Sequence, residues 1–202
     1  GDSALEFGLQ AYAGLVVFIL FSDVVNRSPR LILDHANLVK KVVFPLEILP
    51  WVAILAGLFH LALSLAALLV AAAVAHGGLP MTVVALPLVI VPLVPLLMGL
   101  AWFFAAVGVY VRDAGQVITL LVNLLMFLSP VFYPVSALPE RWQPWLQANP
   151  LTPAIEQLRR VALDGLWPQW SQLGLNLAIA IVIAWAGARW FAATRKGFAD
   201  VL

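Results

Sequence analysis

Long apolar stretches that contain almost no charged residues recur along the whole sequence. Five of them are candidates for crossing a membrane: residues 5–25, 46–75, 81–111, 116–133 and 171–191. An α-helix rises about 1.5 Å per residue, so about 20 apolar residues span the hydrocarbon core of a bilayer. Only 10% of the residues are charged, whereas a soluble domain typically carries about 25%. The sequence therefore predicts an all-α fold, a single polytopic membrane helix bundle over residues 1–202 with five spans.

Proline and small residues predict how these spans bend and pack. Three prolines inside residues 81–111 are expected to bend that helix, because proline has no N–H to donate; they are Pro87, Pro92 and Pro95. Alanines at four-residue spacing predict close helix packing in two other spans. They are Ala67, Ala71 and Ala75 in one span and Ala180, Ala184 and Ala188 in the other.

A polar and basic segment, Leu31–Pro50, separates the first two spans. If residues 31–44 form a helix, Leu31, His35, Leu38 and Val42 share one face at i, i+4, i+7 and i+11. Asn37, Lys40 and Lys41 then lie more towards the other side. Such a helix is amphipathic and too polar to span, and Pro45 is expected to end it.

A second unusual segment, residues 134–170, is rich in proline and tryptophan. It is expected to contain two short helices, Pro139–Asn149 and Pro153–Leu163, with Pro153 in a first turn and Gly165 as a stop signal. Tryptophan is enriched where a membrane meets water. These residues are therefore predicted to lie at the membrane surface.

The distribution of Lys and Arg predicts the orientation. If the chain crosses the membrane five times, eight of the 11 basic residues lie on one side, and cytoplasmic loops carry the excess of Lys and Arg. These eight are Arg27, Arg30, Lys40, Lys41, Arg112, Arg189, Arg195 and Lys196; the other three are Arg141, Arg159 and Arg160. Residues 31–44 and the C-terminus are thus predicted to be cytoplasmic, and residues 134–170 to face outwards.

The sequence lacks the common signatures of catalysis. It has no cysteine and no GxxxxGK[ST], GxSxG, GxGxxG or HExxH motif, and its three histidines lie far apart. We therefore expect neither a metal site nor a nucleotide site on this chain. None of the carboxylates lies in the middle of a predicted span, whereas proton- or ion-coupled carriers usually place one there. This pattern favours an external energy source that acts through cytoplasmic loops, and the net charge of +1 gives no indication of nucleic-acid binding.

Several short segments, in this order, resemble the membrane permease of type-2 ABC exporters, in the branch that exports O-antigen, capsular polysaccharide or teichoic acid. They are residues 37–45 (NLVKKVVFP), Leu49-Pro50, residues 110–113 (YVRD), residues 128–134 (LSPVFYP), residues 149–151 (NPL) and residues 198–200 (FAD). The family has six spans and an amphipathic helix before the first. The resemblance thus implies that residues 5–25 correspond to the second span, and that one helix and one span precede them.

The resemblance also implies partners and a location. Two copies of the permease would pair, and two separate nucleotide-binding subunits would bind ATP and magnesium, so this chain itself would need no cofactor. The cargo would be a polysaccharide or glycolipid, with the lipid bilayer as surroundings and no nucleic acid. The location would be the bacterial cytoplasmic (inner) membrane, and the protein would be a multi-pass transport permease rather than an enzyme.

Three sets of candidate functional residues follow from the resemblance. The residues expected to couple to the ATPase subunit are Asn37, Leu38, Lys40, Lys41, Phe44, Pro45, Arg112 and Asp113. The aromatic residues expected along the substrate path are Tyr12, Phe18, Phe21, Phe127, Phe132 and Tyr133. The residues expected at the outer gate are Trp142, Trp145, Asn149 and Pro150.

Each set also has a simpler interpretation. Lys40 and Lys41 could serve only to orient the chain, the aromatic residues could face lipid or pack, and the tryptophans could be interfacial anchors. Other functions stay open as well: a permease for a drug, peptide or lipid, a proton-coupled carrier, or a membrane-embedded enzyme acting on a lipid-linked sugar through a carboxylate such as Glu156.

Overall fold

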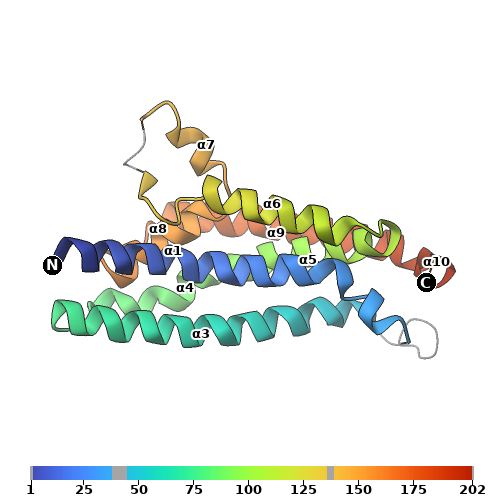
Figure 1. Ribbon diagram of the computed structural model, residues 1–202, viewed down its shortest axis with the longest axis horizontal. Helices are drawn as coiled ribbons and strands as arrows, with labels where there is room; N and C mark the ends of the chain where they lie inside the picture. Colours follow the sequence, from blue (N-terminus) through green and yellow to red (C-terminus); the bar gives the residue numbers. More distant parts are fainter. Residues whose placement is uncertain (1, 38–44, 136–138, 202) are drawn as a thin grey trace.

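The computed structural model describes residues 2–37, 45–135 and 139–201, and every regular element in these ranges is helical. Long helices lie side by side and run alternately in opposite directions (Figure 1). This arrangement confirms the predicted all-α, polytopic helix bundle. The long helices are α1 (Asp2–Arg27), α3 (Leu49–His76), α5 (Leu93–Tyr110), α6 (Ala114–Leu128) and α9 (Trp170–Thr194).

Short elements connect the long helices. The short α-helices are α4 (Leu86–Ile90), α7 (Gln143–Gln147), α8 (Thr152–Ala162) and α10 (Phe198–Val201). The 3-10 helices are η1 (Ser28–Arg30), η2 (Leu33–His35), η3 (Leu46–Ile48), η4 (Met81–Ala85) and η6 (Arg195–Gly197).

Four helical segments are long and apolar enough to cross a membrane: Ala4–Arg30, Leu46–His76, Met81–Tyr110 and Trp170–Gly197. They coincide with four of the five predicted spans. The fifth predicted span, residues 116–133, is represented by α6, which has only 15 residues. It measures about 22 Å, against a hydrocarbon core of about 30 Å. The helix ends at Leu128 because Ser129 precedes Pro130 and has extended backbone angles (φ −100°, ψ 147°).

Proline and glycine define the breaks between helices. α3 ends where Gly77 takes a left-handed conformation with φ 72°, which costs glycine little. The third crossing consists of η4, α4 and α5, with breaks at Ala85 and at Val91-Pro92. The predicted interruption by proline is thus confirmed near Pro87 and at Pro92, whereas Pro95 lies in the first turn of α5 without a break.

The closest approach between long helices is that of α5 and α9. A Cβ atom added to Gly99 would overlap the backbone carbonyl of Ile183, and one added to Gly187 would overlap the carbonyl of Gly99. The two backbones are therefore in direct contact. In the alanine series of α9, Ala180 is buried, whereas Ala67 and Ala71 of α3 are exposed. The expectation of close packing through alanine was therefore wrong for Ala67 and Ala71, because they point away from the bundle.

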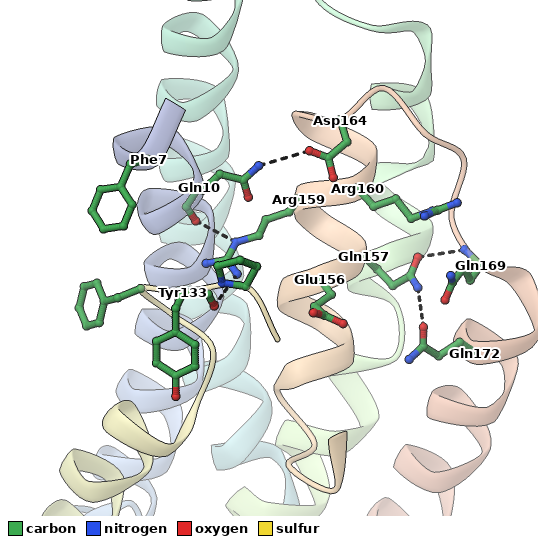
Figure 2. Close-up of a pocket in the computed structure, with 12 residues that line it drawn as sticks. Phe7, Gln10, Tyr133, Glu156, Gln157, Arg159, Arg160, Asp164, Gln169 and Gln172 are labelled. Atoms are coloured by element: carbon green, nitrogen blue, oxygen red, sulfur yellow. Dashed lines mark hydrogen bonds between the residues drawn. The ribbon is translucent and has the colours of Figure 1, made fainter. Parts of the chain in front are cut away.

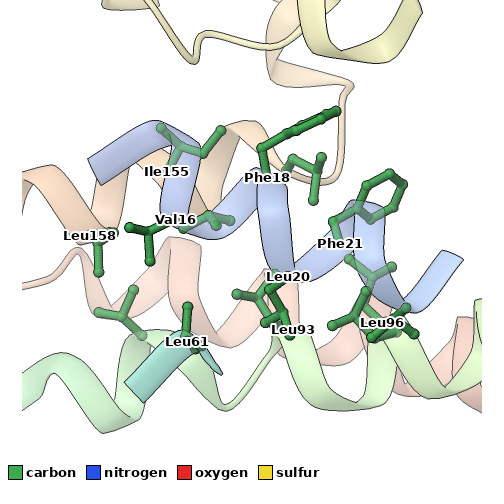
Figure 3. Packing of buried hydrophobic residues seen from close by; sticks show 14 of the residues in the cluster. Val16, Phe18, Leu20, Phe21, Leu61, Leu93, Leu96, Ile155 and Leu158 are labelled. Carbon is green, nitrogen blue, oxygen red and sulfur yellow. The ribbon is translucent and has the colours of Figure 1, made fainter. Parts of the chain in front are cut away.

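The main apolar core lies between α1, α3, α5 and α8 (Figure 3). Val16 and Leu20 of α1 face Leu61 of α3, Leu93 of α5 and Leu158 of α8 in this cluster. On the outside of the bundle many large apolar side chains are exposed, most of all along α3 and α9. Exposure of this kind suits a lipid surrounding rather than water.

Candidate functional site

One end of the bundle carries Arg27, Arg30, Arg112, Arg195 and Lys196, and we call it the basic end. A small apolar cluster holds this end together and is separate from the main core. Its members come from four places in the sequence: Ile32, Leu49, Ala105, Ala106, Val109, Phe191 and Phe198. Ile32 and Phe198 are fully buried. The start of the predicted coupling helix therefore packs against α5 and against the C-terminal segment.

Polar contacts reinforce the same connection. The Arg195 guanidinium pairs with the Glu47 carboxylate. The indole N–H of Trp102 donates to the backbone carbonyl of Glu47 at 3.3 Å, and the Tyr110 hydroxyl donates to the carbonyl of Thr194 at 2.7 Å. The segment that leads into α3 is thereby fastened to both α5 and α9.

The structure describes only part of the predicted coupling helix, residues 31–44. Residues 28–35 form the 3-10 helices η1 and η2 in place of the start of a continuous α-helix. One reason is local, because Nδ1 of His35 donates to the carbonyl of Leu31 at 2.8 Å while the His35 backbone N–H bonds to Ile32. Asn37 is exposed. The candidates Leu38, Lys40, Lys41 and Phe44 lie outside the described residues, so their coupling role stays a prediction.

The remaining coupling candidates are Pro45, Arg112 and Asp113, and all three are exposed at the basic end. Asp113 precedes α6, and its backbone carbonyl accepts the N–H groups of Gln116 and Val117.

A cavity of about 620 Å³ lies at the same end of the bundle. It is lined by Arg27, Arg30, Asp34, Gln116 and their neighbours at the end of α1, around η1 and η2 and at the start of α6. These positions are available to a partner at the surface of the bundle.

The opposite end carries α7 and α8, and we call it the gate end. Ser129, which is fully buried just after α6, connects α6 to α8. The Asn149 side chain donates to the Ser129 hydroxyl at 2.8 Å and accepts the N–H of Leu151 at 3.0 Å. The hydroxyl of Ser129 in turn donates to the carbonyl of Leu125 at 2.7 Å. Asn149, a predicted gate residue, therefore joins the end of α6 to the start of α8, while Pro150 is exposed.

Arg159 of α8 is buried, with only 5% of its surface exposed. Its guanidinium donates to three backbone carbonyls: that of Gln10 at 2.9 Å, that of Val131 at 2.6 Å and that of Tyr133 at 3.4 Å. This side chain therefore ties α8 to α1 and to the segment that follows α6. Gly14 makes room for it, because a Cβ there would lie 2.6 Å from the Val131 carbonyl oxygen and 2.8 Å from the Arg159 guanidinium.

A polar cavity of about 440 Å³ opens beside Arg159. Figure 2 shows Glu156 between Tyr133 on one side and Gln157 and Gln172 on the other. Burial raises the pKa of the Glu156 carboxyl above its usual value of 4.5, although the backbone N–H of Val135 and the charge of Arg159 act in the opposite direction. Burial also lowers the pKa of Arg159, against the effect of Glu156 and Asp164.

The raised pKa of Glu156 predicts a pH dependence of stability. The folded protein holds this proton more tightly than the unfolded chain, so the contribution is fully present below pH 4.5 and is lost as the pH rises through the folded pKa. Glu156→Gln removes this titration. In detergent, the thermal stability of the wild type is expected to fall, relative to the variant, as the pH rises above 4.5 through the folded pKa. Parallel stability curves for the two proteins would contradict the prediction.

The predicted gate tryptophans are at the surface. Trp142 is 50% exposed and Trp145 is 75% exposed, and the Arg141 guanidinium lies 5.5 Å from the Trp142 ring centre. Of the two short helices predicted here, α8 matches the expected length, whereas α7 has only five residues, Gln143–Gln147, within the predicted range 139–149. Pro153 lies in the first turn of α8, and Gly165 follows α8 with φ 66°. Both features agree with the expectations from the sequence, whereas a gating role for the tryptophans stays a prediction.

The structure does not bring the six predicted path residues together on one surface. Phe18 and Phe21 of α1 are buried, with ring centres 6.1 Å apart, and they act as packing residues in this conformation. Tyr12 is partly buried. Phe127, Phe132 and Tyr133, in contrast, gather near the end of α6, and the Tyr133 hydroxyl donates to the Phe127 carbonyl at 3.2 Å. Their role in a path stays a prediction.

Comparisons with known proteins connect these features to a family. The sequence profile described as ABC-2 type transporter matches residues 5–163. An O-antigen export system permease protein RfbA from Myxococcus xanthus is 29% identical over 198 residues, which are 96% of this chain and 76% of the relative. A Klebsiella pneumoniae protein of the same name is 22% identical over 191 residues, 94% of this chain and 73% of the relative. The polysialic acid transport protein KpsM of Escherichia coli is 25% identical over 162 residues, 80% of this chain and 63% of the relative.

Proposed function

This chain belongs to the ABC-2 type transporter family, and from this membership we infer that it is the membrane-spanning subunit of an exporter for a polysaccharide or a lipid-linked glycan. The observation that carries the proposal is the family match over residues 5–163, which include Arg27, Arg30 and Arg112 of the basic end and α8 at the gate end. The cargo is inferred from relatives that are named for O-antigen export and polysialic acid transport.

The energy for export would come from a separate ATPase subunit that binds ATP and magnesium, with the permease acting as a homodimer in the bacterial cytoplasmic membrane. The basic end would face the cytoplasm, together with the C-terminus. This orientation is supported by the five basic residues of that end, because cytoplasmic loops are enriched in Lys and Arg. The ATPase subunit would act on the 3-10 helices η1 and η2, and Ile32, which lies between them, packs into the same cluster as Phe198.

Deleting the gene in its own bacterium tests this function. We expect the cell to lose a surface polysaccharide and to accumulate the same polymer inside the cytoplasmic membrane, and the intact gene to restore export. Immunoblots and sugar analysis of surface and internal fractions measure both effects. Unchanged surface polysaccharide, with loss of export of a drug, peptide or lipid, would overturn the polysaccharide assignment.

The charge pair Lys40-Lys41 tests the coupling surface. The double variant Lys40→Glu/Lys41→Glu reverses both charges, so ATPase-subunit binding and export are expected to fall at least about tenfold, as for other charge reversals that cost several kcal/mol at an interface. Co-purification with the ATPase subunit and surface polysaccharide measure the two effects. Arg189→Glu, which lies on α9 outside the predicted coupling residues, is the matched control. Full export by the double variant would contradict a coupling role for the two lysines.

A further inference from the structure

The cavity beside Glu156 is formed by four separate parts of the chain. They are the start of α1, the segment after α6, α8 and the start of α9 (Figure 2). Its volume of about 440 Å³ lies within the range of about 300–1,000 Å³ that is typical of small-molecule sites. It lies at the gate end, which faces outwards in the proposed orientation. The cavity is therefore placed where a glycan would leave the bundle.

The polar side chains around the cavity are held in place and still have hydrogen-bonding capacity to spare. The Gln10 amide donates to one oxygen of Asp164 at 3.2 Å, so the other Asp164 oxygen remains available. Arg160 uses its Nε to donate to the Trp167 carbonyl at 2.8 Å, which leaves its terminal amino groups. Among the described residues no partner is recorded for these remaining atoms. The cavity thus offers both donors and acceptors, as the hydroxyl groups of a sugar require.

The amides on the α9 side form a preorganised wall. The Gln157 side chain donates to the Gln172 carbonyl oxygen at 2.8 Å and accepts the backbone N–H of Gln169 at 3.0 Å. Because Gln172 uses only its oxygen in this bond, its amino group remains as a donor among the described contacts. Fixed groups of this kind bind a ligand with a small loss of conformational entropy.

Aromatic rings form the opposite wall. Phe7 of α1 is 60% exposed and Phe132 is 39% exposed, and both line the cavity together with Tyr133. An exposed ring offers a flat apolar surface. Such a surface matches the C–H face of a sugar ring, whereas it contributes nothing to the binding of a free phosphate.

The charges in the cavity balance. Glu156 and Asp164 face Arg159 and Arg160, and the guanidinium of Arg159 is already occupied by three backbone carbonyls. Only Arg160 remains for an anion, and two carboxylates oppose it. A neutral, polyhydroxylated ligand therefore fits the cavity better than a phosphate or pyrophosphate.

We propose that this cavity is a saccharide-binding subsite at the outer mouth, which holds a short stretch of the exported glycan between the rings of Phe7 and Phe132 and the polar side chains Glu156, Asp164 and Gln172. The proposal rests on the proposed function. It adds a defined contact point for the polymer on the outer side of the bundle.

Binding to the purified permease–ATPase complex tests the proposal. The probe is a set of short oligosaccharides, cut from the surface polysaccharide of the same bacterium and freed of lipid. Saturation-transfer NMR in nanodiscs is expected to show sugar protons in contact with the wild-type complex. The variant Phe7→Ala/Glu156→Gln removes one exposed ring and replaces one acceptor by a donor, and its affinity is expected to be at least about tenfold lower, as for the loss of about one good contact.

The matched control is Phe59→Ala/Glu140→Gln. It makes the same two changes at exposed residues that do not line the cavity, so its affinity is expected to equal that of the wild type. Equal affinity in the cavity variant and the control would overturn the subsite. Displacement of the oligosaccharide by inorganic pyrophosphate at similar concentration would also overturn it, in favour of an anion site.

The amount of surface polysaccharide in the cell shows whether the subsite alone fails or the exporter function fails as well. If the gene is needed for surface polysaccharide but the cavity variant binds the oligosaccharides like the wild type, the subsite is refuted and the exporter stands. If surface polysaccharide does not depend on the gene, the exporter itself is refuted, together with the subsite that rests on it. Melting curves of both double variants are expected to show that they are folded, because Phe7 is exposed and Gln has the shape of Glu.

Discussion

Gly187→Ala is expected to force α9 away from α5 and to destabilise the protein by about 3 kcal/mol, since overpacking a tight contact costs about 1–3 kcal/mol and occasionally more. The upper end applies because the added Cβ would meet the backbone of Gly99, which cannot rotate out of the way as a side chain can. For a chain of 202 residues this corresponds to a melting temperature lower by about 6–12 °C. Thermal unfolding in detergent, followed by tryptophan fluorescence, measures the effect.

Gly174→Ala is a control on the same helix. Nothing lies within 4 Å of a Cβ added at Gly174, and alanine is favoured over glycine in a helix by about 1 kcal/mol. The control is therefore expected to melt at the same temperature as the wild type or slightly above it. If both variants melted at a higher temperature than the wild type, helix propensity would outweigh the contact with α5 and the prediction for Gly187→Ala would be wrong.

Arg159→Leu is expected to destabilise the protein by about 3–5 kcal/mol, the usual cost of removing one partner from a buried charged network. Three backbone carbonyls, those of Gln10, Val131 and Tyr133, would lose their donor inside the protein. Glu156 and Asp164 would also lose a nearby positive charge. The melting temperature is expected to fall by about 10 °C or more. Protease cleavage after Tyr133 is expected to become faster, because Arg159 no longer fastens this segment to α8.

Two further variants distinguish the geometry of Arg159 from its charge. Arg159→Lys keeps the charge, but its single ammonium cannot reproduce the planar fork that reaches several carbonyls, so an intermediate loss is expected. Arg141→Leu removes an exposed guanidinium that lies over the Trp142 ring, and its effect is expected to stay within about 1 kcal/mol. If Arg159→Lys were as stable as the wild type, the positive charge alone, without the planar guanidinium, would be sufficient to stabilise this part of the fold.

Features that depend on local sequence could be predicted. The positions of the long helices follow from the apolar stretches, and Pro153 and Gly165 lie at the two ends of α8 as expected. Such features are determined by residues close together in the chain. The predicted span 116–133 is too long because Ser129-Pro130 stops α6 at Leu128; this local signal outweighs the apolar pattern that continues to residue 133.

Features that depend on which helix faces meet could not be predicted. Gly99 and Gly187 lie 88 positions apart in the sequence, and nothing in one sequence indicates that they touch. Arg159 was counted only as one of three basic residues on the outer side, although it is buried. The apolar residues around it, Ile155, Leu158 and Val161 among them, could have suggested burial, because they cover the face of a short helix that also carries the arginine.

The straight helix α9 links the two ends of the molecule mechanically. It has 25 residues and is therefore about 37 Å long. Close to its C-terminal end Arg195 is paired with Glu47, and near its N-terminal end Gln172 is bonded to Gln157 of α8. Because α9 touches α5 backbone to backbone at Gly187, we expect a movement of α9 to pivot near this contact. Gln172 lies 15 residues from Gly187, which is about 22 Å along the helix. A tilt of about 5° around Gly187 would therefore move Gln172 by about 2 Å, so a push at the basic end would shift the wall of the cavity beside Glu156.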